Sequence, residues 1–171
     1  MTYKESLCKD MKWLGERKDT VFIGQGIIKG DRMYGTLNDV PSNKCIEMPI
    51  AENLIMGVAN GLALLGFRPV VIFQRMDFML IAADQIINHT ALIDEMSNGQ
   101  FKCPVIIRAC IGSQKESFCV GEQHRHNFKH VFSPYIKTLD YNINAYKNAY
   151  NNISPILIVE EKDLYETEVS K

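Results

Sequence analysis

Three short runs of apolar, mostly branched residues constrain the fold of this chain more than any other feature of its sequence. They read RPVVIFQ at 68–74, CPVIIRAC at 103–110 and PILIVEE at 155–161. Strands that are apolar along most of their length, rather than at every second residue, are buried on both faces of a sheet. Because parallel sheets covered by helices bury their strands in this way, the runs predict a parallel central sheet.

The segments between these runs have the residue spacing of helices. We expect helices at 2–17, 50–65, 77–99 and 142–152, and further strands at 20–24 and 135–139. The third helix is apolar almost all round, which predicts that it is long and buried. No repeat or Pro/Gly/Ser-rich linker interrupts the pattern, so residues 1–171 are expected to form one domain. The sequence therefore predicts an α/β fold of three layers, in which helices cover both faces of a mostly parallel central sheet.

Ligands of such sheets bind beyond the carboxyl ends of the strands. Three polar stretches follow expected strands, namely GQG at 24–26, QRMDF at 74–78 and IGSQKESFCVGEQHRH at 111–126. Because the strands are expected to be parallel, these loops should lie along one rim of the sheet. The stretch GQGIIKG matches neither Gly-rich nucleotide pattern, GxGxxG or GxxxxGK[ST], so the residues alone predict no nucleotide site.

Charge and cysteine content restrict the setting. The formal net charge of −1 gives no electrostatic reason to expect nucleic acid or an anionic membrane as a partner. The first 19 residues are charged and lack the apolar centre of a signal peptide. No apolar stretch is long enough to span a membrane. The five cysteines form no CxxC pair, which favours a reduced, cytoplasmic protein; they are Cys8, Cys45, Cys103, Cys110 and Cys119.

Glu52 is an isolated carboxylate near the start of the expected helix at 50–65. One interpretation is electrostatic, because a carboxylate at the positive end of a helix contributes about 0.3–1 kcal/mol. The other is functional, since a carboxylate held in an apolar pocket can meet a specific ligand there. The spacing of residues leaves both interpretations open.

Three histidines lie in the segment GEQHRHNFKH at 121–130. His126 and His130 are four residues apart and would share one face of a helix, but no cysteine or carboxylate completes a zinc ligand set, so no metal site is predicted. His124 follows a long polar loop, where catalytic side chains tend to lie. The alternative for His124 is an ordinary, solvent-exposed loop histidine.

Five segments in order carry a resemblance to a known family. CIEMPIAEN at 45–53 is similar to D-T-P-I-[SA]-E, and the segment at 61–91 to G-x-A-x-x-G-x-R-P-V-x-E-F-x-x-x-D-F-x-x-x-A-x-D-Q-I-x-N. MSNGQFKCPVIIRA, VGEQHRHNF and PILIVEEKDLY are similar to M-S-G-G-x-x-x-x-P-x-V-I-R, G-x-Q-H-S-Q and P-V-I-F-x-E-x-x-x-L-Y. The chain thus resembles the pyrimidine-binding domain of thiamine diphosphate enzymes. Among these enzymes, its segments most resemble the transketolase-like beta subunit of the 2-oxo acid dehydrogenase first component.

The resemblance implies roles for individual residues. Glu52 would hydrogen-bond a ring nitrogen of the cofactor's aminopyrimidine and favour the imino tautomer, which removes the proton from the thiazolium carbon. Ile50 would line the aminopyrimidine pocket, Phe78 would stack on the ring and Gln74 would lie nearby. His124 would face the thiazolium side and help to protonate or position the substrate.

The resemblance also implies partners and a reaction class. The G-D-G…N motif that binds the Mg²⁺ and the diphosphate is absent from this sequence. A diphosphate-binding, alpha-type subunit is therefore expected to supply the Mg²⁺ site, in an assembly with two copies of each chain. The family's carboxyl-terminal domain is expected to be absent, because the sequence ends six residues after Tyr165.

The expected function is that of the pyrimidine-binding subunit of a two-chain, decarboxylating enzyme acting on a 2-oxo acid. The alternatives are a transketolase-like subunit acting on a ketose, a carboligase subunit, or a non-catalytic regulatory module of the same fold. Four positions depart from the family pattern. Gln25 and Ile72 stand where the family has acids, and Arg125 and His126 replace Ser-Gln. The changes at 125 and 126 alter the charge at the expected substrate mouth, and the departures bear on the substrate more than on the cofactor.

Overall fold

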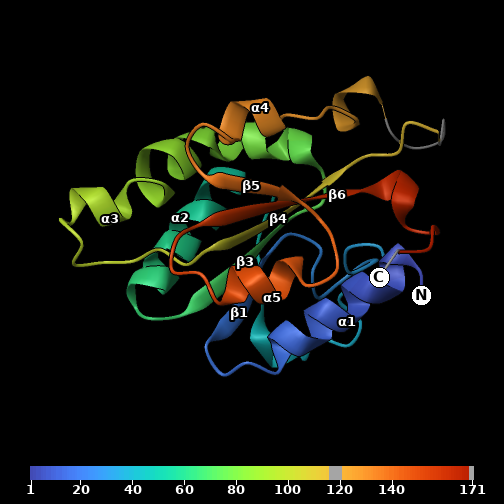
Figure 1. Ribbon diagram of the computed structural model, residues 1–171, viewed down its shortest axis with the longest axis horizontal. Helices are drawn as coiled ribbons and strands as arrows, with labels where there is room; N and C mark the ends of the chain where they lie inside the picture. The colour runs from blue at the N-terminus through green and yellow to red at the C-terminus, as the bar shows by residue number, and fades with distance from the viewer. Residues whose placement is uncertain (116–120, 170–171) are drawn as a thin grey trace.

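The computed structural model describes residues 1–115 and 121–169, and these residues form a central sheet of six strands that all pair in parallel (Figure 1). Along the sheet the strands lie in the order β2-β1-β3-β4-β6-β5. This confirms the parallel sheet expected from the apolar runs. The strands are β1 (Thr20–Gly24), β2 (Cys45–Glu47), β3 (Arg68–Phe73), β4 (Ile106–Ile111), β5 (Lys137–Asp140) and β6 (Ile156–Glu161).

Helices cover both faces of this sheet. In Figure 1, α1 and α5 lie in the lower part of the picture, and α3 and α4 lie in its upper part. One buried core packs between the sheet and α1 and α5, and a second packs between the sheet and the helices of the other face, including α2. The three-layer α/β fold is therefore confirmed. The α-helices are α1 (Tyr3–Gly15), α2 (Glu52–Leu64), α3 (Ile93–Met96), α4 (Lys129–Phe132) and α5 (Ala145–Tyr150).

Alternate residues of a strand enter the two cores, because successive side chains of a strand point to opposite faces. In β4, Ile107 and Ala109 belong to the core beneath α2, whereas Ile106 and Cys110 belong to the core beneath α1. Burial on both faces explains why this strand is apolar almost throughout.

The segment at 77–99 differs from the single buried helix expected from its sequence. It contains a 3₁₀-helical segment, η2 (Met76–Ala82), a π-helical segment, η3 (Gln85–Thr90), and the short helix α3. The hydroxyl of Thr90 lies 2.9 Å from the carbonyl oxygen of Gln85 and 2.7 Å from Oδ1 of Asn60. A hydroxyl in these positions competes for the backbone carbonyls that a regular helix needs. The expected burial holds only in part within this chain, since Met79, Ala82 and Ile86 are buried but Leu80, Ile81 and Met96 are exposed.

Two further differences concern strands. Strand β2, at one edge of the sheet, has only three residues and no apolar run, so its residues carry no strand signal. Strand β4 begins at Ile106 rather than at Cys103.

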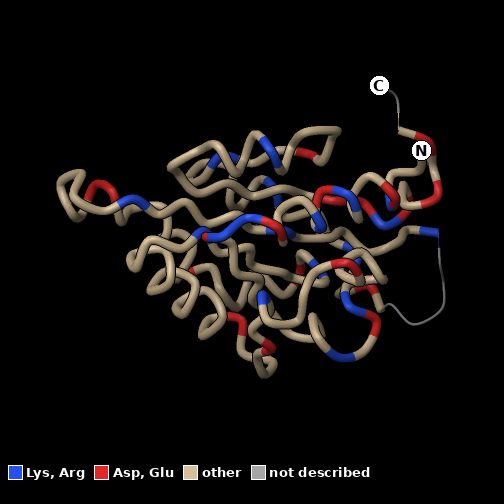
Figure 2. Tube along the Cα trace, turned by 90° about the horizontal axis from the view of Figure 1, so that it is seen from below, with Lys and Arg blue, Asp and Glu red and all other residues tan. Residues whose placement is uncertain are grey.

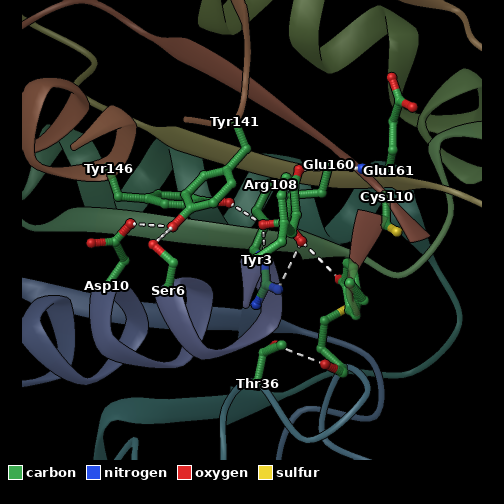
Figure 3. A network of polar contacts seen from close by, with 12 residues as sticks. Tyr3, Ser6, Asp10, Thr36, Arg108, Cys110, Tyr141, Tyr146, Glu160 and Glu161 are labelled. Carbon is green, nitrogen blue, oxygen red and sulfur yellow. Dashed lines mark hydrogen bonds and ion pairs between the residues drawn. The ribbon is translucent and has the colours of Figure 1, made fainter. Parts of the chain in front are cut away.

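A buried ion pair crosses two neighbouring strands on the α1 side of the sheet (Figure 3). Arg108 of β4 donates from Nε and Nη2 to the two carboxylate oxygens of Glu160 of β6, at 2.6 and 2.9 Å, and both side chains are fully buried. The hydroxyls of Tyr146 and Tyr165 donate to the same carboxylate at 2.5 and 2.9 Å. Burial, followed by the Glu160 charge, raises the pKa of both tyrosines well above the usual range. These phenols therefore stay protonated and serve as donors.

Charges of both signs are distributed over the rest of the chain. Figure 2 shows Lys and Arg mixed with Asp and Glu along the described trace. Among the described residues, no helix is long and apolar enough to cross a membrane.

Candidate functional site

A cavity of about 370 Å³ opens where strands β1 and β3 end and α2 begins. This is the edge of the sheet at which the sequence predicts ligand binding. Ile50, Glu52, Gln74 and Phe78, the four residues predicted to contact the cofactor, all line it. The full lining comprises Gln25, Ile50, Glu52, Ile55, Ile72, Phe73, Gln74, Phe78 and Ile81.

Glu52 is the one acidic residue in this lining. It is the first residue of α2 and is only 7% exposed. Within the part of the chain that the structure describes, its carboxylate has no hydrogen-bond or ion-pair partner. A carboxylate that faces a cavity and has no protein partner is available to a ligand that donates a hydrogen bond. The position at the head of α2 agrees with the electrostatic interpretation, and the position in the cavity agrees with the functional one.

Gln74 is held against the loop that follows β1. Its Nε2 donates to the carbonyl oxygen of Gln25 at 3.1 Å, and the Tyr34 hydroxyl donates to the Gln74 carbonyl at 3.2 Å. Gly26 has a φ of +68°, and a Cβ built there would lie 2.5 Å from Gln74 Nε2. A glycine at this position therefore permits both the left-handed backbone and the close approach of Gln74.

Glu47 is a residue that the sequence reasoning missed. Its carboxylate accepts hydrogen bonds from the backbone N–H groups of Gly26, Ile27 and Ile28, the latter two at 3.0 and 2.7 Å. Successive N–H groups that converge in this way form an anion-binding nest, which here is filled by the protein's own carboxylate. The signal was available in the segment CIEMPIAEN, where Glu47 aligns with the acid of the family's D-T-P-I. Glu47 thereby fixes the loop against which Gln74 packs.

A second hollow, of about 440 Å³, adjoins the first. Gln25 and Gln74 line both spaces and so separate them. The second hollow is more polar, because Lys29, Asp31 and Glu47 also line it.

His124 does not line the cavity but contacts a residue that does. Its ring centroid lies 5.5 Å from that of Phe78, with the ring planes at 84°. His124 belongs to the 3₁₀-helical turn η4 (Glu122–His124) and is half-buried. A Cβ on Gly112, just after β4, would lie 2.1 Å from the His124 carbonyl oxygen, so only glycine permits this approach.

The remaining histidines and cysteines form no further site within the described residues. His126 lies outside α4, so it does not share a helix face with His130. Among residues 1–115 and 121–169, no group of three or more His, Cys, Asp or Glu side chains could hold a metal ion. Burial raises the pKa of the Cys103 and Cys110 thiols to about 12, which makes them poor nucleophiles. Cys119 and residues 116–120 of the polar loop lie outside the described residues.

Comparison with known proteins decides the family. The family described as transketolase, pyrimidine binding domain, matches residues 6–117. The chain belongs to this family. The resemblance inferred from the five sequence segments is thereby confirmed.

Individual relatives agree with this membership. The chain is 31% identical to the pyruvate dehydrogenase E1 component subunit beta of Rickettsia conorii, covering 96% of this chain and 53% of that protein. It is 32% identical to the 2-oxoisovalerate dehydrogenase subunit beta of Bacillus subtilis, covering 66% of this chain and 36% of that one. The pyrimidine-domain chain therefore spans about half, or less, of the length of these relatives.

A solved structure described as a split gene transketolase, inactive beta4 tetramer, has a TM-score of 0.71 at 20% identity. The match covers 93% of this chain and 51% of that chain. At this level of identity the likeness supports the fold alone.

The Gly26 geometry leads to a prediction with a matched control. Gly26→Ala should lower the free energy of unfolding by more than the roughly 1–2 kcal/mol that a left-handed backbone costs an L-residue, because the new Cβ also displaces Gln74. Gly30→Ala is the control, since Gly30 has a φ of +76° but a methyl group placed there would meet no described atom within 4 Å. Denaturant unfolding of both variants gives the comparison. Equal losses at the two positions would show that Gln74 moves away without cost.

Proposed function

We propose that this chain is the pyrimidine-binding subunit of a two-chain, thiamine diphosphate-dependent enzyme that acts on a 2-oxo acid. The observation that carries the proposal is Glu52, a buried carboxylate that no other described residue pairs, in a mostly apolar cavity at the carboxyl edge of the sheet. Family membership supports the cofactor, and the names of the relatives support the substrate class.

The residues of the cavity fit the aminopyrimidine ring of this cofactor. The volume of about 370 Å³ lies within the range of roughly 300–1,000 Å³ that is common for small-molecule sites. The walls are mostly apolar, and Glu52 offers one acceptor on a ring-sized surface formed by Ile50, Ile55 and Phe78. When bound, thiamine diphosphate supplies a nucleophilic carbon and an electron sink for carbonyl chemistry.

The chain's own residues would bind and orient this group. Glu52 would hold a proton at a pyrimidine ring nitrogen, which is a task for a carboxylate in a site shielded from water. The face of Phe78 would contact the ring, and Ile50 would cover its edge. His124, placed beside Phe78, would hold or move a proton at the substrate.

We further propose that an alpha-type subunit completes the site with the Mg²⁺ and the diphosphate-binding residues. Ile50 lines the cavity and is 79% exposed, so the cavity has an open side in the isolated chain. Leu54, Leu65 and Ile81, on α2 and η2 or just beyond, are exposed as well and offer apolar surface for burial. Both relatives named above are called beta subunits, which agrees with a partner of another kind. We expect two copies of each chain.

The cytoplasm is the location that we propose for this assembly. Of the cysteines in the described residues, Cys8, Cys45, Cys103 and Cys110 are free thiols. Free thiols without disulfides are usual in a reducing compartment.

The test is calorimetric titration of thiamine diphosphate with Mg²⁺ into the chain alone and into the chain co-purified with its alpha-type partner. We expect binding only in the presence of the partner, and weaker binding with Glu52→Ala. Turnover of 2-oxo acids should then exceed that of ketoses. Turnover of ketoses alone would favour the transketolase-like alternative. Absence of binding in every combination would contradict the proposal and leave a non-catalytic module of this fold.

A further inference from the structure

Two segments distant in sequence face each other at the rim of the cavity, and two contacts join them. The first is the ring contact of Phe78, in η2, with His124, in η4. The second is an ion pair in which Nδ1 of His126 lies 2.7 Å from Oδ1 of Asp77. Asp77 directly precedes Phe78, and His126 follows His124 by two residues. The two contacts therefore join residues that are close in sequence on each segment.

Asp77 is the more buried residue of this ion pair. Its side chain is only 9% exposed, whereas that of His126 is 54% exposed. A carboxylate only accepts hydrogen bonds, so the His126 Nδ1 donates to it. Within the described residues, the second carboxylate oxygen of Asp77 has no hydrogen-bond partner. His126 is thus the sole described side chain that satisfies this buried charge.

Among the described residues, other contacts of the segment that carries His124 lie within the segment or join it to Phe128 and to the loop after β4, where Gly112 closely approaches the His124 carbonyl oxygen. Residues 121–126 belong to no strand, and η4 is a single turn closed by the N–H of His124 to the Gly121 carbonyl at 3.0 Å. Gln114 Nε2 donates to the Arg125 carbonyl at 2.8 Å. The His126 ring also lies 5.2 Å from that of Phe128. Of these attachments, only the pair with Asp77 joins the segment to η2 by a charged hydrogen bond.

We propose that the Asp77–His126 pair is a positioning pair that holds His124 against Phe78 at the rim of the cavity. Neither residue lines the cavity, so the pair acts through His124 rather than on a ligand. A charge-assisted hydrogen bond is shorter and about twice as strong as a neutral one, which suits it to fixing a loop. The catalytic consequence rests on the proposed function, whereas the placement of His124 does not.

The placement is tested on the full chain without partner or cofactor. Labelling the four histidines with ¹³C at Cε1 gives one NMR signal for each ring, and the Phe78 ring should shift the His124 signal through its ring current. Phe78→Leu identifies that shift by removing it. We expect Asp77→Ala, which removes the acceptor, and His126→Ala, which removes the donor, to abolish the shift. His126→Asn should retain it, because its amide Nδ2 occupies the place of the imidazole Nδ1.

His130→Ala is the matched control, since His130 lies in the same region but forms no ion pair with any described residue. It should leave the His124 signal unchanged. Folding of each variant is checked from the dispersion of its remaining signals. A His124 signal that keeps its ring-current shift in both Asp77→Ala and His126→Ala would overturn the positioning role.

The assembled enzyme provides the second readout. A misplacement of about 1 Å can cost on the order of 10²-fold in rate, so His126→Ala should lower kcat by that factor with little change in the affinity for thiamine diphosphate. His126→Asn should recover most of the loss. If the wild-type assembly binds no cofactor, the proposed function fails while the NMR result still decides the positioning role. If kcat is unchanged in a His126→Ala variant whose His124 signal has moved, His124 needs no such placement and the catalytic part of the proposal is wrong.

Discussion

Glu52→Gln is expected to lower kcat of the assembled enzyme by about 10²–10⁴-fold, the usual contribution of a positioned acid or base. The variant keeps the size of the side chain and its ability to accept a hydrogen bond, but an amide cannot take up and release a proton as a carboxylate does. Binding of thiamine diphosphate should weaken much less than kcat falls. Steady-state kinetics on the assembly, together with calorimetry, measure the two effects separately.

The free energy of unfolding of a Glu52 variant distinguishes the two interpretations of this residue. If the residue only complements the positive end of α2, its neutralisation should lower the free energy of unfolding by about 0.3–1 kcal/mol and leave activity intact. If it is kept for a ligand, removal of a buried carboxylate without a partner should leave stability unchanged or raise it. We expect the second result. Such a conflict between stability and activity is common at functional sites.

Glu95→Gln is the control for this experiment. Glu95 is a glutamate in α3 that is exposed and lies outside both hollows. Its replacement should change neither kcat nor the free energy of unfolding. A Glu52→Gln variant that behaves like Glu95→Gln would show that the carboxylate has no part in the reaction.

The largest expected effect on stability is at the ion pair between β4 and β6. Arg108→Met should lower the free energy of unfolding by about 3–5 kcal/mol, because it leaves the Glu160 charge buried without a cation. The tyrosine donors remain, but hydroxyls do not neutralise a carboxylate. Burial alone would lower the pKa of the Arg108 guanidinium, yet the Glu160 charge holds it well above the usual value. The Arg108 guanidinium is therefore expected to stay protonated throughout the range of pH in which the protein is studied.

Two further variants make this prediction decisive. Arg108→Met combined with Glu160→Leu should recover much of the lost stability, since replacing both partners of a buried pair is often neutral. Lys102→Ala is the control, because it breaks an ion pair of 2.5 Å whose side chains are 42% and 47% exposed. An exposed pair of this kind contributes about 0–1 kcal/mol. Urea unfolding of the full chain gives all three values. If Arg108→Met alone does not fold, the prediction is tested by whether the double variant folds. If neither variant folds, the prediction is wrong.

The sequence predicted the sheet well because burial on both faces makes the sequence of a strand apolar almost throughout. Ile106, Ile107, Ala109 and Cys110 serve two cores at once, so polar residues are scarce in the strand and its type is unambiguous. Strand β2 has no such apolar pattern, since it has only three residues and lies at an edge of the sheet. The break in the segment at 77–99 depends on hydrogen bonds of Thr90 to distant groups, which periodicity does not encode.

The candidate site was predictable where residues resemble a motif and not where they act through the backbone. Ile50, Glu52, Gln74 and Phe78 meet around one cavity, although their binding of a cofactor stays a prediction. Glu47 was missed because its role depends on three N–H groups of a loop more than 18 residues away in sequence. His124 lies beside the cavity but does not line it. Its position depends on the path of the loop that carries it, which residue types alone do not determine.

The length and charge of the two edge strands affect how copies of the chain associate. The outermost strands, β2 and β5, are short, and they end in or include charged residues such as Glu47, Lys137 and Asp140. Short, charged edges resist the addition of further strands from other molecules. Of the apolar residues with more than half of their surface exposed, Leu54 and Ile81 lie on α2 and η2, whereas the edge strand β2 exposes only part of Ile46. Contacts between copies should therefore form through helices and close on themselves, and concentrated solutions of the chain should give discrete oligomers rather than fibrils.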